Sequence, residues 1–430
     1  MFGFHTIGVL IFAAATSQVP DGERPLSAKP VQVRAATPRK ILTLREALDL
    51  AERNHPQLQV ATDRLNQANA GIQTARAYLN PELSFGSLGH QRSIQPGTLP
   101  GWLHGFTFSQ TFELPQLRRS RIAAAQLGRA SSQYALDEDR LIIRGMVQQS
   151  FFEALRRKGE IQLAQENLRL LQELQRRIRV QYDVGEASRL ELTRADTEVS
   201  VAAVQAQSAE RRYSTALADL HAAIGVPLDS YEPDAPLDPV VILPPLQEMI
   251  NSVLARHPGI AAAEMESRRA GANVDVEKAL KLPQPTGWID ILQQPDVAQY
   301  RFGVAVTIPL WNQRAGQIAE AEAARHQSES QADLRRLQLS AAVERAYGEY
   351  RTAQSEVEMF ENGILLQAQD AVRGAEAAFQ FGERGILEVL DAQRVLRSSR
   401  LEYINAQYDR QQARVVLEQL GALDPRSINP

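Results

Sequence analysis

One short stretch occurs twice in this chain, and both times it interrupts a very long helical pattern. Residues 182–195 read YDVGEASRLELTRA, and residues 379–392, 197 positions later, read FQFGERGILEVLDA. In each copy one glycine, Gly185 or Gly382, interrupts the helical pattern and is followed by a glutamate and then by a new apolar periodicity; the second copy also contains Gly385. A lone glycine between two periodic runs marks a tight reversal between helices. The sequence therefore predicts two long helical hairpins, one in each half of the chain.

The hairpins are expected to be long because proline is absent around both glycines, between Pro115 and Pro227 and again between Pro309 and Pro425. At about 1.5 Å per residue, residues 116–182 predict a helix roughly 100 Å long. In both returning helices, apolar residues recur at spacings of three and four, which is typical of a coiled-coil seam. Alanine is frequent in this seam, so the neighbouring helices must pack closely. The seam residues are Leu192, Ala195, Val199, Ala202, Ala206, Ala209, Tyr213, Ala216, Leu220 and Ala223, and then Val389, Ala392, Leu396, Ser399, Tyr403, Ala406, Ala413, Leu417 and Leu420, with Arg410 as the one interruption.

The two halves repeat one plan. Asn-His-Pro at 54–56 matches Arg-His-Pro at 256–258 with an offset of 202 positions, and Pro81 matches Pro283 at the same offset. Such internal similarity indicates a duplicated structural unit. We assign residues 41–226 to the first repeat, 244–424 to the second repeat, and the proline-rich residues 227–243 to a linker.

The N-terminus begins with a short apolar stretch, residues 7–15, which is followed by small and polar residues. This is typical of a secretory signal peptide, here residues 1–17, although the usual basic start is missing; the alternative is a frayed apolar terminus. We expect extended tails at 18–40 and 425–430. No later apolar run approaches the ~18 residues of a transmembrane helix.

In residues 106–114 and 302–310 the pattern changes to an alternation of apolar and other residues, which predicts strands with one apolar face. Residues 83–88 and 288–292 are the expected partner strands, so each half contributes one β-hairpin. A transmembrane barrel requires strands of about 9 to 11 residues with one apolar face, and these segments meet that requirement. The residues expected to face the membrane are Phe106, Phe108, Phe112 and Leu114 in the first half and Phe302, Val304, Val306 and Ile308 in the second.

Four strands cannot close a barrel, because known barrels begin at eight strands. An open edge would leave unpaired backbone groups in hydrocarbon, at several kcal/mol each. If the hairpins lie in a membrane, the chain must therefore oligomerise: two copies give eight strands, and three give twelve with room for a lumen. From periodicity alone, a soluble coiled-coil protein with small β caps remains the alternative.

Composition and motifs point away from several functions. The formal net charge of -4 shows no basic excess of the kind that nucleic-acid binders have. The absence of cysteine removes disulfides and thiolate chemistry, and no HExxH, P-loop, GxSxG or Rossmann glycine motif occurs. His55 and His257 precede proline and are expected to be local turn residues rather than ligands. We therefore expect no enzyme activity, no cofactor, no tight metal site and no nucleic-acid partner.

With these features together, the chain resembles the TolC-type outer-membrane factors of Gram-negative efflux pumps over essentially all of residues 41–424. The stretches that carry the resemblance are the Asn-His-Pro start, the tip at 182–195, TIPLWN at 307–312 with GQIA at 316–319, and FGERGILEVLDAQRVL at 381–396. The last two look most like the cobalt-zinc-cadmium and copper-silver branch, which serves heavy-metal pumps of the resistance-nodulation-division (RND) class.

The resemblance implies a mixed α/β membrane protein that forms a homotrimer, with a twelve-stranded barrel in outer-membrane lipid and a helical tunnel in the periplasm. It implies a passive conduit, here for heavy-metal cations, that is opened by a periplasmic adaptor and energised by an inner-membrane RND transporter. Multidrug efflux and type I secretion remain alternatives within the family. A coiled-coil structural or adhesin-like trimer without a channel is the alternative from another class.

The resemblance also implies a gate. The two gate acids of the family fall on Glu388 and Asp391, its arginine latch on Arg384, and the carboxylate that meets this arginine on Glu191. Phe379 stands where some members carry a tyrosine whose hydroxyl joins the latch, so the closed state here could be held differently. Without the resemblance, all four charged residues would be interpreted as ordinary solvated helix charges. Because only the second copy carries the arginine and both acids, we expect it to be the inner, moving hairpin.

The two tips are the expected docking site for the adaptor. A glycine there would allow another helical tip to approach the backbone closely, or would simply supply a left-handed turn. The predicted docking residues are Val184, Gly185, Glu186, Ala187 and Ser188 in the first tip and Phe381, Gly382, Glu383 and Gly385 in the second.

Overall fold

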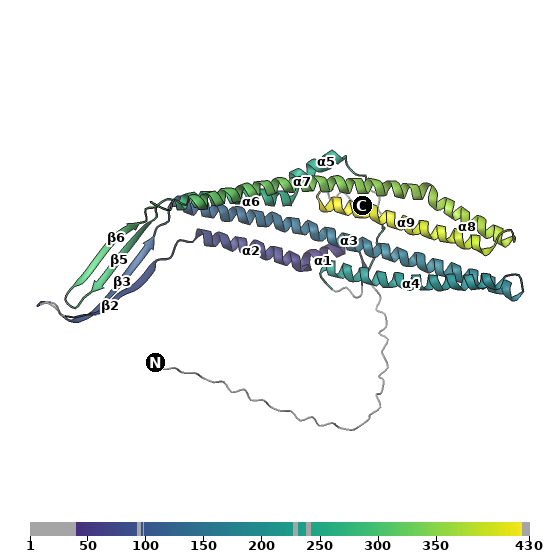
Figure 1. Ribbon diagram of the computed structural model, residues 1–430, viewed down its shortest axis with the longest axis horizontal. Helices are drawn as coiled ribbons and strands as arrows, with labels where there is room; N and C mark the ends of the chain where they lie inside the picture. Colours follow the sequence, from purple (N-terminus) through teal and green to yellow (C-terminus); the bar gives the residue numbers. More distant parts are fainter. Residues whose placement is uncertain (1–39, 93–95, 98, 227–230, 238–241, 424–430) are drawn as a thin grey trace, which may run out of the picture. The chain divides into compact units, whose positions relative to one another are not determined.

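The computed structural model describes residues 40–92, 96–97, 99–226, 231–237 and 242–423 (Figure 1). The predicted signal peptide, the predicted tail up to residue 39 and the predicted C-terminal tail lie outside these described residues. Residues 40–430 form one unit by their internal contacts, and the fold below is that of its described part.

The first half follows the predicted order of elements. It contains α1 (Leu44–Asn54), α2 (Pro56–Arg76), β2 (Glu82–Gln91), β3 (Gly101–Thr111), α3 (Pro115–Asp183) and α4 (Arg189–Ile224). The 69-residue α3 and the returning α4 make the first hairpin, and the alanines of the predicted α4 seam are buried. A short strand β1 (Lys40–Leu42) precedes α1 and pairs in parallel with β4 (Tyr231–Pro233), which lies inside the predicted linker.

The second half repeats this order with α5 (Leu246–Arg256), α6 (Pro258–Leu280), β5 (Pro285–Gln293), β6 (Ala298–Val306), α7 (Ala315–Met359), α8 (Leu365–Gln380) and α9 (Ile386–Gln419). We call α8 and α9 the second hairpin. Between α7 and α8 the chain makes one π-helical turn, η1 (Phe360–Ile364), which the proline-free pattern did not predict. This turn contains Asn362 and Gly363, two weak helix formers. The hydroxyl of Tyr403 on α9 donates to Glu361 Oε1 at 2.8 Å and ties the turn to α9.

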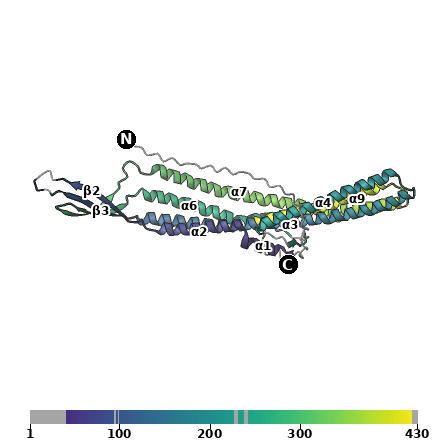
Figure 2. The same cartoon turned by 90° about the horizontal axis from the view of Figure 1, so that it is seen from below.

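The helices lie side by side along most of their length (Figures 1 and 2). α2 packs on α3, α3 on α6, and α6 on α7, while α4 and α9 both lie against the second part of α3. Because α3 follows directly from β3, the tip of its hairpin lies about 100 Å along the helix from the strands. The strands and the tips are therefore at opposite ends of the same helices.

The four long strands form one antiparallel sheet in the order β2-β3-β5-β6. The predicted hairpins β2–β3 and β5–β6 are confirmed, and the two halves of the chain join through β3 and β5. In that central pair, Phe106 lies opposite Ile291 and Phe108 lies opposite Ile289. Since residues directly opposite one another share a face of the sheet, the apolar faces of the two halves become continuous.

The two faces of the sheet differ in polarity. One carries most of the exposed apolar side chains, whereas the other carries a polar row in which Thr107 Oγ1 donates to Asp290 Oδ1 at 2.8 Å and Arg301 Nε donates to Asp290 Oδ2 at 3.0 Å. The predicted alternation of both segments is therefore confirmed. The exposed apolar residues are Leu83, Phe85, Phe106, Phe108, Ile289, Ile291, Tyr300, Phe302, Val304 and Val306.

Three of the predicted membrane-facing residues lie beyond the strands, so their assignment to strands was wrong. Phe112 and Leu114 follow the end of β3, because Pro115 begins α3 and Leu114 is its N-cap residue. Ile308 follows the end of β6, since Val306 already pairs with Pro285, the first residue of β5. None of the described helices is both long and apolar enough to cross a membrane.

Histidine side chains cap α2 and α6, two of the three described helices that begin with proline. His55 accepts the backbone N–H of Gln57 through Nδ1 at 3.2 Å, and His257 accepts that of Gly259 at 3.0 Å. Pro56 and Pro258 occupy the first helical position, where a missing N–H costs nothing. These contacts give both histidines a local role at the turn, and a cap of this kind requires Nδ1 to be unprotonated.

Acid should weaken the cap at His257. Burial lowers the pKa of His257, while Glu138 acts in the opposite direction and Arg335 reinforces the lowering. The folded chain then binds fewer protons here than the unfolded chain, so this stabilisation is complete above the ordinary pKa of about 6.5 and is lost as the pH falls below it. We expect the thermal unfolding midpoint of the purified protein to fall as the pH is lowered below about 6.5. His257→Asn, which caps without titrating, should reduce that dependence.

His326→Asn is the matched control for this experiment. His326 lies exposed on α7 and contacts Glu329 on the same helix, and it caps no helix. Its replacement should leave the pH dependence as in the wild type. An unchanged pH dependence in His257→Asn would show that the cap is not the sensitive group.

Candidate functional site at the helical tips

The first tip closes with a Schellman motif, in which two backbone bonds seal the end of α3. The N–H of Glu186 donates to the carbonyl of Gln181 at 2.8 Å, and that of Gly185 donates to Tyr182 at 3.0 Å. Gly185 has φ +85°, the left-handed conformation that this motif requires. No atom lies within 4 Å of a Cβ built on Gly185, so the backbone angle alone explains the glycine within one chain.

The second tip has the same geometry. The N–H of Glu383 donates to Ala378 at 2.9 Å, that of Gly382 donates to Phe379 at 3.1 Å, and Gly382 has φ +71°. A Cβ on Gly385, the N-cap residue of α9, would meet only Glu388 Oε2, at 3.7 Å, which is ordinary van der Waals contact. The repeated sequence motif thus specifies a repeated backbone structure.

The predicted docking residues form the surface of both tips, with one exception. Val184 is 66% exposed and Phe381 is 80% exposed, and each ends its hairpin with an apolar side chain in water. Ala187 instead packs against a buried cluster that includes Ile178, Ala195 and Ile386. This cluster joins α3, α4 and α9, so the second hairpin rests on the first through apolar contacts close to the tips.

Three of the predicted gate residues lie in the first two turns of α4 and α9, and Arg384 lies in the second tip itself, but each of the four has a local partner. Arg384 Nη1 lies 3.8 Å from Glu388 Oε1, one turn away on α9. Glu191 accepts the backbone N–H of Ser188 at 2.7 Å and completes a capping box at the start of α4. Within one chain the structure therefore does not bring Arg384 and Glu191 together.

A groove of about 500 Å³ lies between α4 and α9 just behind the tips. Glu388 and Asp391 both line it, on the α9 side, and Glu198 lines it on the α4 side. Arg394 also belongs to this lining and is bonded to Glu198 Oε1 at 2.9 Å. Arg194 on α4 lines the groove as well, so the arrangement places three carboxylates and two arginines along one surface between the two hairpins, and Arg394 lies between Glu198 and Asp391.

Arg394 was missed by the sequence interpretation, as were two further arginines on α9. Arg397 Nη1 donates to Gln205 Oε1 on α4 at 2.5 Å, and Arg400 Nη1 donates to Glu166 Oε1 on α3 at 3.0 Å. Their spacing of three residues was visible in the sequence and indicates a common side of a helix. Their partners lie about 190 to 230 positions away, which the sequence could not reveal.

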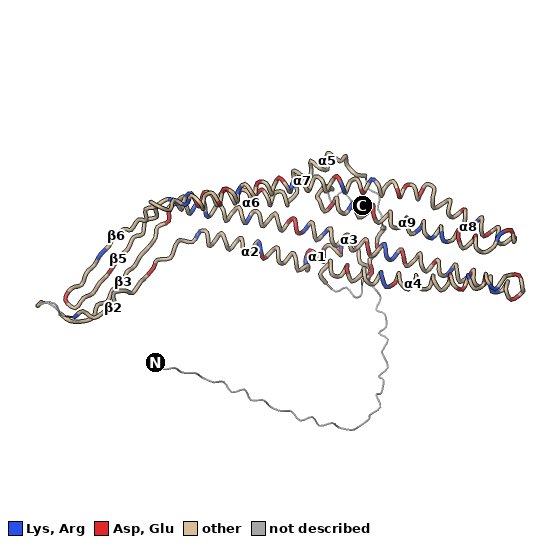
Figure 3. The backbone as a smooth tube through the Cα atoms, in the orientation of Figure 1, with Lys and Arg blue, Asp and Glu red and all other residues tan. Residues whose placement is uncertain are grey.

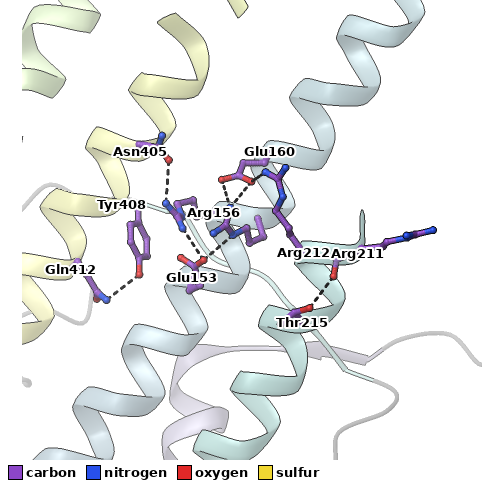
Figure 4. Close-up of polar contacts among 10 residues, drawn as sticks. Glu153, Arg156, Glu160, Arg211, Arg212, Thr215, Asn405, Tyr408 and Gln412 are labelled. Carbon is purple, nitrogen blue, oxygen red and sulfur yellow. Dashed lines mark hydrogen bonds and ion pairs between the residues drawn. The ribbon is translucent and has the colours of Figure 1, made fainter. Parts of the chain in front are cut away.

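A polar network fixes α9 to the middle of α3 (Figure 4). Arg156 donates to Glu153 Oε1 at 2.8 Å and to Asn405 Oδ1 at 3.2 Å, and its guanidinium lies 4.4 Å from the ring centroid of Tyr408. Burial, together with the neighbouring charge of Glu153, raises the pKa of Tyr408 to about 12. Tyr408 thus stays a neutral hydrogen-bonding group, and this middle region anchors the helix whose far end carries the candidate gate.

A second network lies nearer the end of α9. Arg414 Nε donates to Glu418 Oε1 at 3.0 Å, and Gln148 on α3 donates to Glu418 Oε2 at 2.8 Å. All three side chains are buried. A buried carboxylate is tolerated here because each of its oxygens has a donor. Among all described residues, no group of three histidine, aspartate or glutamate side chains is placed to hold a metal ion.

Comparisons with known proteins agree with this architecture. The profile of the family described as "Outer membrane efflux protein" matches residues 47–226 and 249–422, that is, both repeats. The chain is 26% identical over 390 residues to the cobalt-zinc-cadmium resistance protein CzcC of Cupriavidus metallidurans, covering 88% of this chain and 90% of CzcC. It is 25% identical over 402 residues to the pyoverdine export outer membrane protein OpmQ of Pseudomonas putida, covering 87% and 84%. A crystal structure of CusC superposes with a TM-score of 0.75 at 20% identity and covers 93% of this chain and 98% of that one.

Proposed function

Because the chain belongs to the outer membrane efflux protein family and is therefore an efflux channel of the outer membrane, we propose that it works as a homotrimer. Three copies of the four-stranded sheet close into one twelve-stranded barrel. The helices of the three copies continue this barrel as a tunnel through the periplasm.

The observation that carries this proposal is the sheet itself. Its exposed apolar face runs across all four strands, and Figure 3 shows few charged residues on the strands compared with the helices. In the described chain, β2 and β6 each pair on one side only. Backbone groups at such edges cannot stay unpaired in hydrocarbon, so β6 of one copy pairs with β2 of the next. Three copies give a barrel with a lumen wide enough to conduct.

The tips form the adaptor-binding end of the channel. The exposed apolar side chains of Val184 and Phe381 each lie next to a glycine whose Cα faces open space. Together they offer a surface on which another helical tip can lie. A periplasmic adaptor that docks there links the channel to an inner-membrane RND transporter. Energy and substrate choice come from that transporter, and this chain supplies the conduit.

The acids behind the second tip narrow and filter the tunnel. Glu388 and Asp391 are three residues apart on α9 and share a side of the helix, so a trimer gathers six carboxylates. A ring of carboxylates attracts cations. Arg384 and Glu191, which do not meet within one chain, come together as a latch between neighbouring copies when the tunnel is closed. Phe379 contributes no hydroxyl to this latch.

The proposed cargo is a heavy-metal cation. Two features support it: the similarity to CzcC, whose name records cobalt-zinc-cadmium resistance, and the acidic pair at the constriction. OpmQ, named for pyoverdine export, is similar at nearly the same level, so an organic cargo is the second candidate. The family-level function is the same in both cases.

A deletion strain of the source bacterium tests the cargo. Challenged with zinc, cobalt, cadmium, copper and silver salts and with hydrophobic drugs, the strain should become sensitive to one or more of the metals. The wild-type gene should restore tolerance, because the conduit is needed for release outside the cell. Sensitivity confined to the drugs would assign the channel to multidrug efflux instead.

A variant of the second tip, expressed in the same deletion strain, tests where the adaptor docks. Gly385→Trp enlarges the second tip, far from the strands, so the protein should still reach the outer membrane, as membrane fractionation will show. It should fail to restore tolerance if the adaptor docks there. Full tolerance with Gly385→Trp would contradict the docking assignment.

A further inference from the structure

Three arginines on one side of α9 reach across to the first hairpin. Arg394, Arg397 and Arg400 contact Glu198, Gln205 and Glu166 at 2.9, 2.5 and 3.0 Å. The first two partners lie on α4 and the third lies on α3. Each contact joins two helices that must separate, near the tips, if the second hairpin moves. These contacts therefore depend on whether the hairpins are together.

Arg394 differs from the other two because it has a second acidic partner on its own helix. Its Nη1 lies 3.8 Å from Asp391 Oδ1, while its Nη2 is bonded to Glu198 at 2.9 Å. A charge-assisted bond is strongest at about 2.7 to 2.9 Å, so Glu198 is the better partner in this arrangement. Asp391 is thus only weakly neutralised while α4 and α9 are close.

The two partners respond differently to a movement of α9. Asp391 and Arg394 are three residues apart on one helix, so the helix keeps them near each other wherever it moves. Glu198 lies on another helix and is left behind. Once its bond to Glu198 breaks, Arg394 retains Asp391 as its partner.

We propose that Arg394 couples closure of the channel to the charge of its acidic constriction. In the closed state it holds α9 against α4 through Glu198. In the open state it pairs with Asp391 and lowers the negative charge that the constriction presents, so that cations attracted to the ring are released outward more readily. This inference rests on the proposed function, because it requires a conducting channel with Asp391 at its constriction.

Single-channel recording in planar bilayers, using the purified full-length protein, tests both roles. Arg394 is 56% exposed, so Arg394→Ala should fold normally. It should raise the open probability about two- to fivefold, the range expected for loss of one exposed ion pair. It should also increase the cation-over-anion permeability ratio, measured from the reversal potential in a salt gradient, because Asp391 is no longer neutralised.

Glu198→Ala distinguishes the effect of Arg394 on channel closure from its effect on the charge of the constriction. It removes the same bond between the hairpins, so the open probability should rise to a similar extent. It leaves Arg394 next to Asp391, so the permeability ratio should not increase. Equal changes of the permeability ratio in Arg394→Ala and Glu198→Ala would overturn the proposal.

The exchange of both charges, Glu198→Arg with Arg394→Glu, gives the sharpest outcome. It restores an ion pair between α4 and α9, so the open probability should return toward the wild-type value. It also places a second acid beside Asp391, so the permeability ratio should exceed that of Arg394→Ala. Failure of the exchange to lower the open probability would show that the Arg394–Glu198 bond does not hold the channel closed.

Arg373→Ala is the matched control. Arg373 lies on α8 of the same hairpin and is exposed, and its bonded partner, Asp370, is on the same helix. Arg373→Ala should change neither the open probability nor the permeability ratio. If the wild type conducts but Arg394→Ala has the same open probability and permeability ratio as Arg373→Ala, only this inference fails. If the wild type forms no conducting steps at all, the proposed function fails as well.

Discussion

Phe302→Arg is expected to reduce assembly of the channel in the outer membrane severely. Phe302 is the central residue of β6, and its side chain is 86% exposed on the apolar face of the sheet. An arginine on the lipid face near the middle of a bilayer costs about 2 to 4 kcal/mol, and the proposed trimer would carry three of them. We expect the heat-modifiable trimer recovered from outer membranes to fall by about tenfold or more. Fractionation followed by electrophoresis of unheated samples measures this.

Ala305→Arg is the control, because its side chain lies on the other face of the same strand. Ala305 is opposite Thr286, in the face that also carries the natural Arg301–Asp290 pair. An added arginine there points away from lipid and should leave the amount of trimer nearly unchanged. If both variants assemble equally well, the apolar face of the sheet does not contact lipid.

Arg414→Met is expected to destabilise the protein by about 3 to 5 kcal/mol. Arg414 and Glu418 are 7% and 6% exposed, and their ion pair is one of the most buried in the described chain. Removing the arginine leaves the Glu418 carboxylate buried with Gln148 as its donor. A carboxylate without its countercharge in this environment is much more costly than the loss of an exposed ion pair. Thermal unfolding of the purified protein in detergent should show a clear drop in midpoint.

The double variant Arg414→Met with Glu418→Met distinguishes the cost of an unpaired charge from the loss of packing. It removes both charges and keeps side chains of similar length, so most of the lost stability should return. A double variant as unstable as Arg414→Met would indicate that packing around α9 matters more than charge. The exposed pair Arg373–Asp370 offers a reference, since Arg373→Ala should shift the midpoint little.

Much of this fold could be predicted from the sequence because its signals are local. Absence of proline over 111 residues allowed a helix of 69, and the glycine tips were correctly placed because a positive φ favours glycine at that point of the chain. Alternation of apolar residues identified the strands and the face that each exposes. The ends of the strands were not predicted correctly: Phe112 and Ile308 continue the apolar alternation but lie beyond β3 and β6, although the N–H of Phe112 still donates to the carbonyl of Pro285 at 2.9 Å.

The candidate site was predicted in part. The sequence placed Glu388 and Asp391 on one side of α9, and both line the groove behind the tips. The capping box of Ser188 and Glu191 is a local pattern that the sequence interpretation overlooked. The bond between Arg394 and Glu198 could not be predicted, since each carboxylate had several arginines that could have been its partner. The choice among such partners is made by the distance between helices, and a sequence does not contain that distance.

The sequence by itself determined the two glycine tips, the alanine seams and the alternating strands, because each depends on residues within a few positions of one another. It also determined the duplicated plan, because the same local patterns recur 197 or 202 positions later. The tertiary structure alone decided the rest. It paired β3 with β5 and so joined the apolar faces of both halves, it placed a π-helical turn between α7 and α8, and it brought Arg394 between Glu198 and Asp391. These features join residues that are far apart in the chain, or follow from how one helix is held against another. The tips, which first appeared as interruptions of a helical pattern, became a candidate site through the packing of the helices behind them.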